Sequence, residues 1–176
     1  MQKETYRKMT NSLRAKPTLA RLVVDGNNAI TNAIYVAYPC LLLWLLLHNG
    51  LDAALKGSFD AMLPKAFLVP CIGFFLLTLL RKGINAPRPY EVFELPPVIN
   101  KQTKGKSFPS RHTFSIFIIG VAFLACCPIP WAGWAVLGLG VCLGTLRVFA
   151  GVHFPRDVVW AAIFAVAFGF IGFYIV

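Results

Sequence analysis

The sequence predicts an all-α protein, a polytopic membrane helical bundle of about five transmembrane helices that allows a further interfacial helix at its amino terminus. Hydrophobic residues make up 57% of its 176 residues and charged residues only 14%, whereas about a quarter of the residues of a soluble domain are charged. The apolar residues gather in long runs, and a helix that crosses a bilayer needs roughly 20 of them in succession. We therefore expect a multi-pass protein of the cell membrane.

The first segment, residues 1–28, is expected to be a basic tail ahead of a membrane-embedded domain that occupies residues 29–176. Lysine and arginine recur along this tail, which lacks the apolar stretch of a cleavable signal peptide. Residues 13–24 have the composition of an amphipathic helix that lies on lipid headgroups. A disordered tail is the alternative for the residues before them.

Five spanning helices are predicted in order along the remaining chain. Their ranges are 29–47, 61–80, 113–127, 131–146 and 158–176. Polar segments at residues 81–112 and 147–157 separate the second span from the third and the fourth from the fifth. Because successive spans alternate in direction, we expect both polar segments at the membrane face that also holds the tail.

The charge balance is strongly basic, with 17 Lys and Arg against 7 Asp and Glu. Basic residues that flank apolar spans contact anionic headgroups. No basic stripe interleaved with aromatic residues lies on a soluble segment, so we do not expect a nucleic-acid partner. The five cysteines lie in or beside apolar runs without metal-ligand spacing to a histidine, which predicts neither a disulfide framework nor a zinc site.

The first candidate motif ends the second span and holds three cations, Arg81, Lys82 and Arg88. Arg88 stands between Pro87 and Pro89, and proline restricts both its own φ and the residue before it. A guanidinium on a stiff backbone suits a planar contact with an oxyanion. The alternative is that these cations only anchor the span in the headgroups.

The second motif, Pro109-Ser110-Arg111-His112, directly precedes the third span. Proline followed by small polar residues is typical of a helix start, where backbone N–H groups without a partner attract anions. Ser110 on its own would be an ordinary N-cap. His112 is an ionisable group inside a membrane helix, and such groups are usually functional.

The third motif joins the fourth and fifth spans and contains Arg147, His153 and Asp157. Pro155 marks a helix start, so Asp157 is expected about one turn beyond His153. Its carboxylate can then accept a hydrogen bond from one imidazole nitrogen and leave the other as a nucleophile. A helix-capping role for Asp157 is compatible with this one.

Together, the three motifs place two histidines, an acid, several cations and two helix starts at one membrane face. This combination indicates phosphoryl transfer through a phosphohistidine, with cations stabilising the charge of the phosphate oxygens. The sequence has no acidic cluster for Mg²⁺ and no Cys/His set for Zn²⁺, so we expect a reaction without metal or other cofactor.

The three motifs resemble the signature motifs of the type 2 phosphatidic acid phosphatase superfamily, which also contains vanadium haloperoxidases. Arg81 stands where the family has a lysine, six residues before the Arg-Pro pair Arg88-Pro89. The family's Pro-Ser-Gly-His motif matches residues 109–112. Its Ser-Arg, His and Asp motif matches Leu146-Arg147, His153 and Asp157.

The resemblance implies a role for each matching residue. His153 is implied as the nucleophile, Asp157 as its orienting acid and His112 as the general acid. With Lys82 and Arg111 as neighbouring cations, the candidate phosphate-binding residues are Arg81, Lys82, Arg88, Ser110, Arg111 and Arg147. The expected substrate is a lipid phosphate of the phosphatidic acid, phosphatidylglycerol phosphate or polyprenyl diphosphate type.

The sequence departs from the family pattern at three positions. Arginine for lysine at position 81 keeps the charge and changes its geometry. Arg111 in place of glycine either adds a phosphate contact or narrows the site. Leu146 in place of serine removes a hydroxyl group.

Two other functions fit the same membrane architecture. One is a non-catalytic lipid-binding or scaffold protein, against which the presence of His112, His153 and Asp157 argues. The other is a vanadium-dependent haloperoxidase, which the position of the site at a bilayer disfavours. The sequence contains no signal for the oligomeric state.

The side of the membrane that the site faces is predicted by two conflicting observations. The resemblance favours the outer face, where bacterial relatives often act. The charge distribution favours the cytoplasmic face, because all Lys and Arg except Lys56 and Lys65 fall on the side of the site, and cytoplasmic loops carry the excess of basic residues. We give more weight to the charges and expect a cytoplasmic site.

Overall fold

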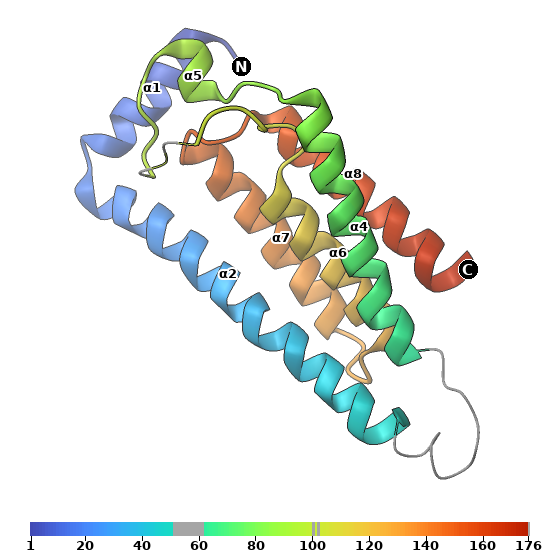
Figure 1. Cartoon of the computed structure of the whole chain (residues 1–176). Coiled ribbons are helices and arrows are strands. Elements are labelled where there is room, and N and C mark those ends of the chain that lie inside the picture. Colours follow the sequence, from blue (N-terminus) through green and yellow to red (C-terminus); the bar gives the residue numbers. More distant parts are fainter. Residues whose placement is uncertain (51–61, 100, 102, 176) are drawn as a thin grey trace.

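The computed structural model describes residues 1–50, 62–99, 101 and 103–175, and these residues form helices without any strand (Figure 1). The elements are α1 (Lys3–Arg14), α2 (Pro17–Leu45), the π-helical turn η1 (Leu46–Gly50), α4 (Met62–Ile84), the short α5 (Pro89–Phe93), α6 (Arg111–Cys126), α7 (Ala132–Phe149), α8 (Pro155–Phe170) and the π-helical turn η2 (Ile171–Ile175). The predicted all-α class is confirmed.

Four helices within the described ranges are long and apolar enough to cross a membrane: α2, α4, α7 and α8, with the short elements that extend them. Helix α6 is apolar but has only 16 residues. It lies among the others and packs against α4, α7 and α8. Each of the five predicted spans therefore corresponds to a helix. The start of the second span at residue 61 and the end of the fifth at residue 176 lie outside the described residues.

The amino-terminal region differs from the prediction. Helix α1 ends at Arg14 and α2 begins at Pro17, so the amphipathic helix expected over residues 13–24 and the span expected to start at residue 29 were wrong in their boundaries. Proline at the first helical position is favoured, because its fixed φ is helical and its missing N–H would have no partner there. Polar residues 25–28 interrupt the apolar pattern but not the helix.

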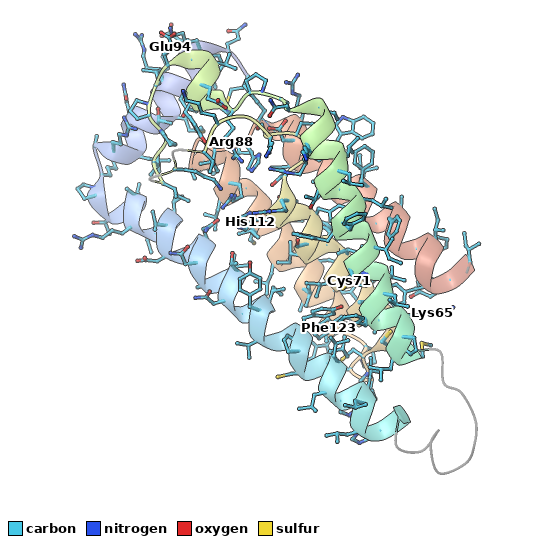
Figure 2. The ribbon with its side chains drawn as sticks, viewed as in Figure 1. Lys65, Cys71, Arg88, Glu94, His112 and Phe123 are labelled. Carbon is cyan, nitrogen blue, oxygen red and sulfur yellow. The ribbon has the colours of Figure 1, made fainter. Side chains whose placement is uncertain are left out.

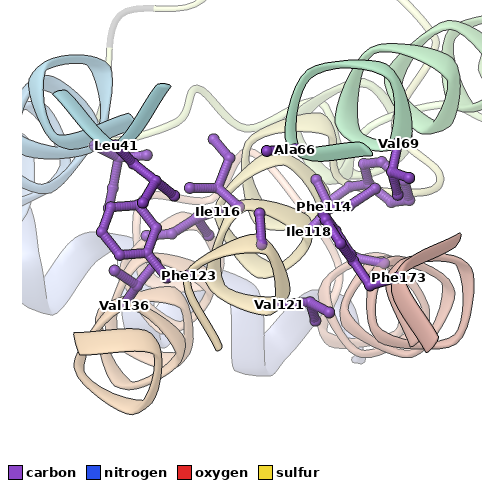
Figure 3. Close-up of a cluster of buried hydrophobic side chains, with 14 of the residues drawn as sticks. Leu41, Ala66, Val69, Phe114, Ile116, Ile118, Val121, Phe123, Val136 and Phe173 are labelled. Carbon is purple, nitrogen blue, oxygen red and sulfur yellow. The ribbon is translucent and has the colours of Figure 1, made fainter. Parts of the chain in front are cut away.

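The hydrophobic core surrounds α6 (Figure 3). Its buried side chains Ile116, Ile118 and Val121 share one cluster with Leu41 of α2, Val69 of α4, Val136 of α7 and Phe173 of η2. Large apolar residues on the outer faces, such as Phe75, Trp134 and Ile163, are exposed. This distribution is that of a bundle whose outer surface contacts lipid.

The two polar segments meet at one end of the bundle, together with α1 (Figure 1). Arg88 of the first segment donates to the carbonyl oxygen of Val152 in the second at 3.2 Å. The start of α2 lies at the same end, since Arg147 contacts Asn27 at 3.1 Å. The structure thus brings together the segments that the alternation of spans placed at a common face.

Candidate active site

His153 and Asp157 form a buried pair where α7 leads into α8. His153 lies in the turn before Pro155, and Asp157 lies in the first turn of α8. Their Nδ1 and Oδ2 atoms are 3.6 Å apart, and the two side chains are 1% and 0% exposed. Because Nδ1 faces the carboxylate, Nε2 is the ring nitrogen left for chemistry.

Ser107 links the two members of this pair. Its hydroxyl donates to Oδ2 of Asp157 at 2.5 Å and lies 3.4 Å from Nδ1 of His153. Ser107 is fully buried. The serine therefore fixes the carboxylate oxygen that faces the imidazole.

Asp157 also connects the starts of two helices. Its Oδ2 accepts a hydrogen bond from the Phe154 backbone N–H at 3.0 Å, which caps α8. Its backbone oxygen accepts from the Ser110 N–H at 2.9 Å. Capping of α8 and pairing with His153, the two roles considered for Asp157, are thus compatible in one geometry. The hydrogen bond from Ser110 to Asp157 also holds the start of α6, where His112 lies two residues further along.

The His153 imidazole is in surroundings that favour its neutral form. Burial lowers its pKa below the usual value near 6.5, and the positive charges of Arg147 and Arg88 act in the same direction. The contact with Asp157 opposes this shift without reversing it. A neutral imidazole at pH 7 keeps the lone pair that a nucleophile needs.

Arg88 connects the loop that follows α5 to the turn of His153. Its Nε donates to the carbonyl oxygen of Gly105 at 3.0 Å, and its Nη1 to that of Val152 at 3.2 Å. Its backbone N–H donates to Glu91 at 2.8 Å, which fixes the start of α5. The side chain is buried, so Arg88 is held rigidly at the site.

The structure separates the two neighbouring cations at the end of α4. Arg81 is buried, and its guanidinium donates to the carbonyl oxygens of Lys106 and Pro109, with Ser107 O at 3.5 Å. Lys82 is exposed. Arg81 therefore holds the backbone that carries Ser107, while Lys82 is not brought into the site.

Arg147, near the end of α7, has unused hydrogen-bond donors. Its Nη1 donates to Oδ1 of Asn27 at 3.1 Å. Its Nε and Nη2 atoms are buried and have no hydrogen-bond partner among the described residues, and the side chain is only 4% exposed. Buried guanidinium donors without partners are costly and suit an oxyanion ligand.

The start of α6 carries Ser110, Arg111 and His112 at three degrees of burial. Ser110 is fully buried and its hydroxyl accepts a hydrogen bond from Thr113 at 3.0 Å. Arg111 is exposed and its guanidinium lies 5.7 Å from the centre of the Phe74 ring. His112 is half-buried, and Figure 2 shows it at the same end of the bundle as Arg88.

Lys101 is influenced by the positive charges of the arginines described above. Burial lowers its pKa to about 8, and the charges of four arginines, Arg147, Arg88, Arg111 and Arg81, contribute to the shift. The neighbouring positive charges thus favour the neutral form of the Lys101 amine.

A cavity of about 230 Å³ begins at Arg111 and His112 and continues between the helices. Its walls come from α2, α4, α6 and α7, and are formed by Thr31, Ile34, Tyr35, Phe74, Ser115, Ile116, Ile119 and Leu143. The charged end therefore opens onto a mostly apolar space inside the bundle. This arrangement suits a ligand with an anionic head and a hydrocarbon tail.

Sequence reasoning assigned no role to Ser107 and Asn27, which contact Asp157 and Arg147. No motif marks Ser107. For Asn27 a signal was present, because Asn27 and Thr31 are polar residues one turn apart at the start of an apolar helix. The histidine, cysteine and acidic residues that the structure describes form no group of three suited to a metal ion.

Comparisons with known proteins agree with this architecture. The sequence model of the PAP2 superfamily matches residues 37–176. The bacitracin transport permease protein BcrC of Bacillus licheniformis is 38% identical over 80 residues, which cover 44% of this chain and 38% of that protein. Undecaprenyl-diphosphatase BcrC of Bacillus subtilis (strain 168) is 28% identical over 144 residues, which cover 82% of this chain and 70% of that protein.

A solved structure has the same fold. Aquifex aeolicus LpxE superposes with a TM-score of 0.70 at 24% sequence identity, over 96% of this chain and 92% of that chain. The match to the superfamily and this likeness, with the apolar helices described above, make the chain a multi-pass membrane protein.

Proposed function

The chain belongs to the PAP2 superfamily, and we propose that it hydrolyses the phosphate ester or diphosphate of a membrane lipid through a phosphohistidine, without a divalent metal. One observation supports this most directly. The buried His153–Asp157 pair lies among buried arginines at the end of the bundle where His112 opens onto an apolar cavity. A nucleophile, a phosphate site and a space for a lipid tail are then contiguous.

The proposed reaction has two steps. In the first, Nε2 of His153 attacks phosphorus, the P–O bond to the lipid breaks, and protonated His112 gives its proton to the leaving oxygen. Asp157 stabilises the proton on Nδ1 of His153. In the second step water attacks phosphorus, neutral His112 takes the proton from that water, and the P–N bond breaks to release phosphate.

The cations stabilise charge on the phosphate oxygens during both steps. Arg147 is proposed as a direct ligand because two of its buried nitrogens lack partners among the described residues. Arg88 and the N–H groups at the start of α6 are proposed beside it. Arg81, whose donors meet backbone carbonyls, is proposed to hold this frame, and exposed Lys82 is left outside it.

For the substrate we propose a polyprenyl diphosphate ahead of phosphatidic acid or phosphatidylglycerol phosphate. The support is the name of the Bacillus subtilis relative, an undecaprenyl-diphosphatase, which aligns with 82% of this chain. In that case the attack of His153 on the terminal phosphorus displaces a lipid monophosphate, and the second step releases inorganic phosphate. All three lipids present an anionic head on an apolar tail, which fits a charged end beside a mostly apolar cavity.

The decisive experiment measures phosphate release by the purified protein in detergent. Undecaprenyl diphosphate and a short-chain phosphatidic acid are the substrates, each with and without EDTA. We expect the wild-type protein to release phosphate with or without EDTA. Orthovanadate should inhibit this release, and His153→Ala should abolish it. A protein that loses activity in EDTA and regains it with Mg²⁺ contradicts the metal-free reaction, and lipid binding without release supports the scaffold alternative.

Trapping the intermediate tests the nucleophile. Wild-type protein quenched during turnover of ³²P-labelled substrate should carry an acid-labile, base-stable phosphate, and His153→Ala should carry none. Because His112 donates the proton to the leaving group, His112→Ala should slow the formation of this species. Near-normal turnover by His153→Ala would overturn the assignment, as would a wild-type protein that never carries the label.

A further inference from the structure

The start of α2 reaches one of the arginines of the proposed phosphate site. Oδ1 of Asn27 accepts a hydrogen bond from Nη1 of Arg147 at 3.1 Å, across 120 positions of the sequence. Both side chains are buried, at 7% and 4% exposure. Of the described residues, Asn27 is the hydrogen-bond partner of this guanidinium, whose other two nitrogens have none.

Asn27 is itself fixed in place. Its Nδ2 donates to Oδ1 of Asn28 at 3.1 Å, which leaves Oδ1 of Asn27 free to accept from Arg147. The Thr31 hydroxyl donates to the Asn27 backbone oxygen at 2.7 Å. The direction of the amide is therefore set by its neighbours on α2.

The approach of α2 to α7 at this level is close. A Cβ atom on Gly26 would lie 3.3 Å from Cδ1 of Leu146, which is a tight contact. Val23, one turn earlier, is buried in a cluster with Ala150 and Val152, and Leu146 packs against this cluster. Packing thus holds the start of α2 against the end of α7 and brings Asn27 into reach of Arg147.

We propose that Asn27 is a positioning residue: its neutral amide orients the Arg147 guanidinium so that Nε and Nη2 face the phosphate, without cancelling the positive charge. The inference rests on the proposed function, since it takes that phosphate as the ligand. Asn27 precedes the residues 37–176 that match the superfamily. Arg147 of the third motif is therefore positioned by a residue that lies outside the region matched to the superfamily.

The chemistry of the amide distinguishes it from a carboxylate. An amide oxygen accepts a hydrogen bond from the guanidinium without placing a negative charge beside it. An aspartate at this position would accept from the same nitrogen, but its negative charge would compete with the phosphate for Arg147. Asn27→Asp keeps the acceptor and the size of the side chain, adds a negative charge and replaces the Nδ2 donor to Asn28 with a second acceptor oxygen.

The test uses the full-length protein in detergent and orthovanadate as a phosphate-like probe. The affinity is measured from the vanadate-dependent rise in melting temperature, which does not depend on lipid turnover. Asn27→Ala should weaken vanadate binding about tenfold, the order expected when a buried charged hydrogen bond is lost, and Asn27→Asp at least as much. Asn32→Ala, an exposed asparagine on the same helix, is the matched control and should bind as the wild type does.

A double-mutant cycle separates positioning from a general structural role. In an Arg147→Ala background, Asn27→Ala should change vanadate affinity less than twofold, because Asn27 then has no guanidinium to orient. Unchanged affinity in both single variants, or the same loss with and without Arg147, would overturn the inference and leave the proposed function standing. A wild-type protein that vanadate does not stabilise would overturn the phosphate site itself, and this inference with it.

Discussion

Three buried arginines carry the positive charge of the candidate active site, and the partners of each side chain determine how that charge is stabilised. Arg81, Arg88 and Arg147 are each less than a tenth exposed, although burying a charge is unfavourable unless hydrogen bonds compensate for the lost water. Backbone carbonyls compensate Arg81 and Arg88, and an amide oxygen compensates Arg147. Because none of these partners carries a negative charge, the site keeps its attraction for an anion.

Lys101 should make anion binding depend on pH. Its pKa is lowered from 10.5 to about 8, so the site loses one positive charge as the pH rises through 8. Between pH 8 and 10.5 Lys101 is more often protonated in the unfolded chain than in the folded one, so its contribution to the free energy of unfolding rises with pH in this range. The affinity of the site for anions should fall over the same range.

We expect the apparent affinity for orthovanadate to fall between pH 7 and 9 about threefold more in the wild type than in Lys101→Arg, whose side chain stays charged. Measuring both proteins in the same buffers cancels the titration of vanadate. Lys104→Arg, at an exposed position, is the control and should keep the wild-type slope. Equal slopes for the wild type and Lys101→Arg would contradict a role for Lys101.

Arg81 and Lys82 should respond differently to truncation. Arg81→Ala removes the donors that hold the carbonyls of Lys106 and Pro109 beside Ser107, so we expect kcat/KM to fall by about a hundredfold. Lys82 is exposed, and Lys82→Ala should stay within about twofold of the wild type. Steady-state phosphate release measures both variants. A larger loss in Lys82→Ala would show that Lys82, rather than Arg81, is the functional cation of the first motif.

At the scale of elements, α1 holds the two loops that frame the site. The Tyr6 hydroxyl contacts the carbonyl oxygens of Gly151 at 3.1 Å and Leu95 at 3.3 Å. Burial raises the Tyr6 pKa to about 12, so the hydroxyl keeps its proton. Gly151 has φ +75°, and a Cβ there would lie 2.7 Å from the Tyr6 oxygen. Glycine is therefore required in the turn that leads to His153.

Tyr6→Phe should destabilise the protein by about 1 kcal/mol, the value of a buried hydrogen bond. The melting temperature should fall by about 2–4 °C for a chain of this size. We also expect kcat to fall, because the turn that carries His153 loses one of its supports. Tyr174→Phe, at an exposed tyrosine in η2, serves as the control. A Tyr6→Phe protein that matches this control in both measurements would show that α1 does not support the site.

At the scale of the whole molecule, the described residues give the bundle a basic end and an end with few charges. Arg88 and His112 mark the basic end, and Lys65 lies toward the other (Figure 2). Lys56, the other basic residue assigned to that side, lies outside the described residues. The excess of basic residues predicts that the end with the site faces the cytoplasm.

Cysteine labelling in cells tests this orientation. In a variant whose five native cysteines are replaced, Thr103→Cys adds a thiol on the exposed loop at the site. A membrane-impermeant thiol reagent should label it only after permeabilisation. His48→Cys, at an exposed position in η1 beyond the far end of α2, should be labelled in intact cells. Labelling of Thr103→Cys in intact cells would place the site outside.

Features that depend on local backbone geometry can be predicted from the sequence alone. The fixed φ of Pro155 favours a helix start at this residue. The four-residue spacing then places Asp157 about one turn beyond His153. The long apolar runs and their alternation likewise determined the membrane bundle and the common end of its polar segments. These features need no knowledge of which helix packs against which.

Tertiary structure sets the contacts between distant segments. Asn27 meets Arg147 over 120 positions, Tyr6 meets Gly151 over 145, and Ser107 meets Asp157 over 50. It also decided between Arg81 and Lys82, because neighbouring residues on a helix point about 100° apart and packing alone selects the inward one. Apolar membrane helices resemble one another in sequence, so the faces that meet are fixed only by side-chain fit in the assembled bundle.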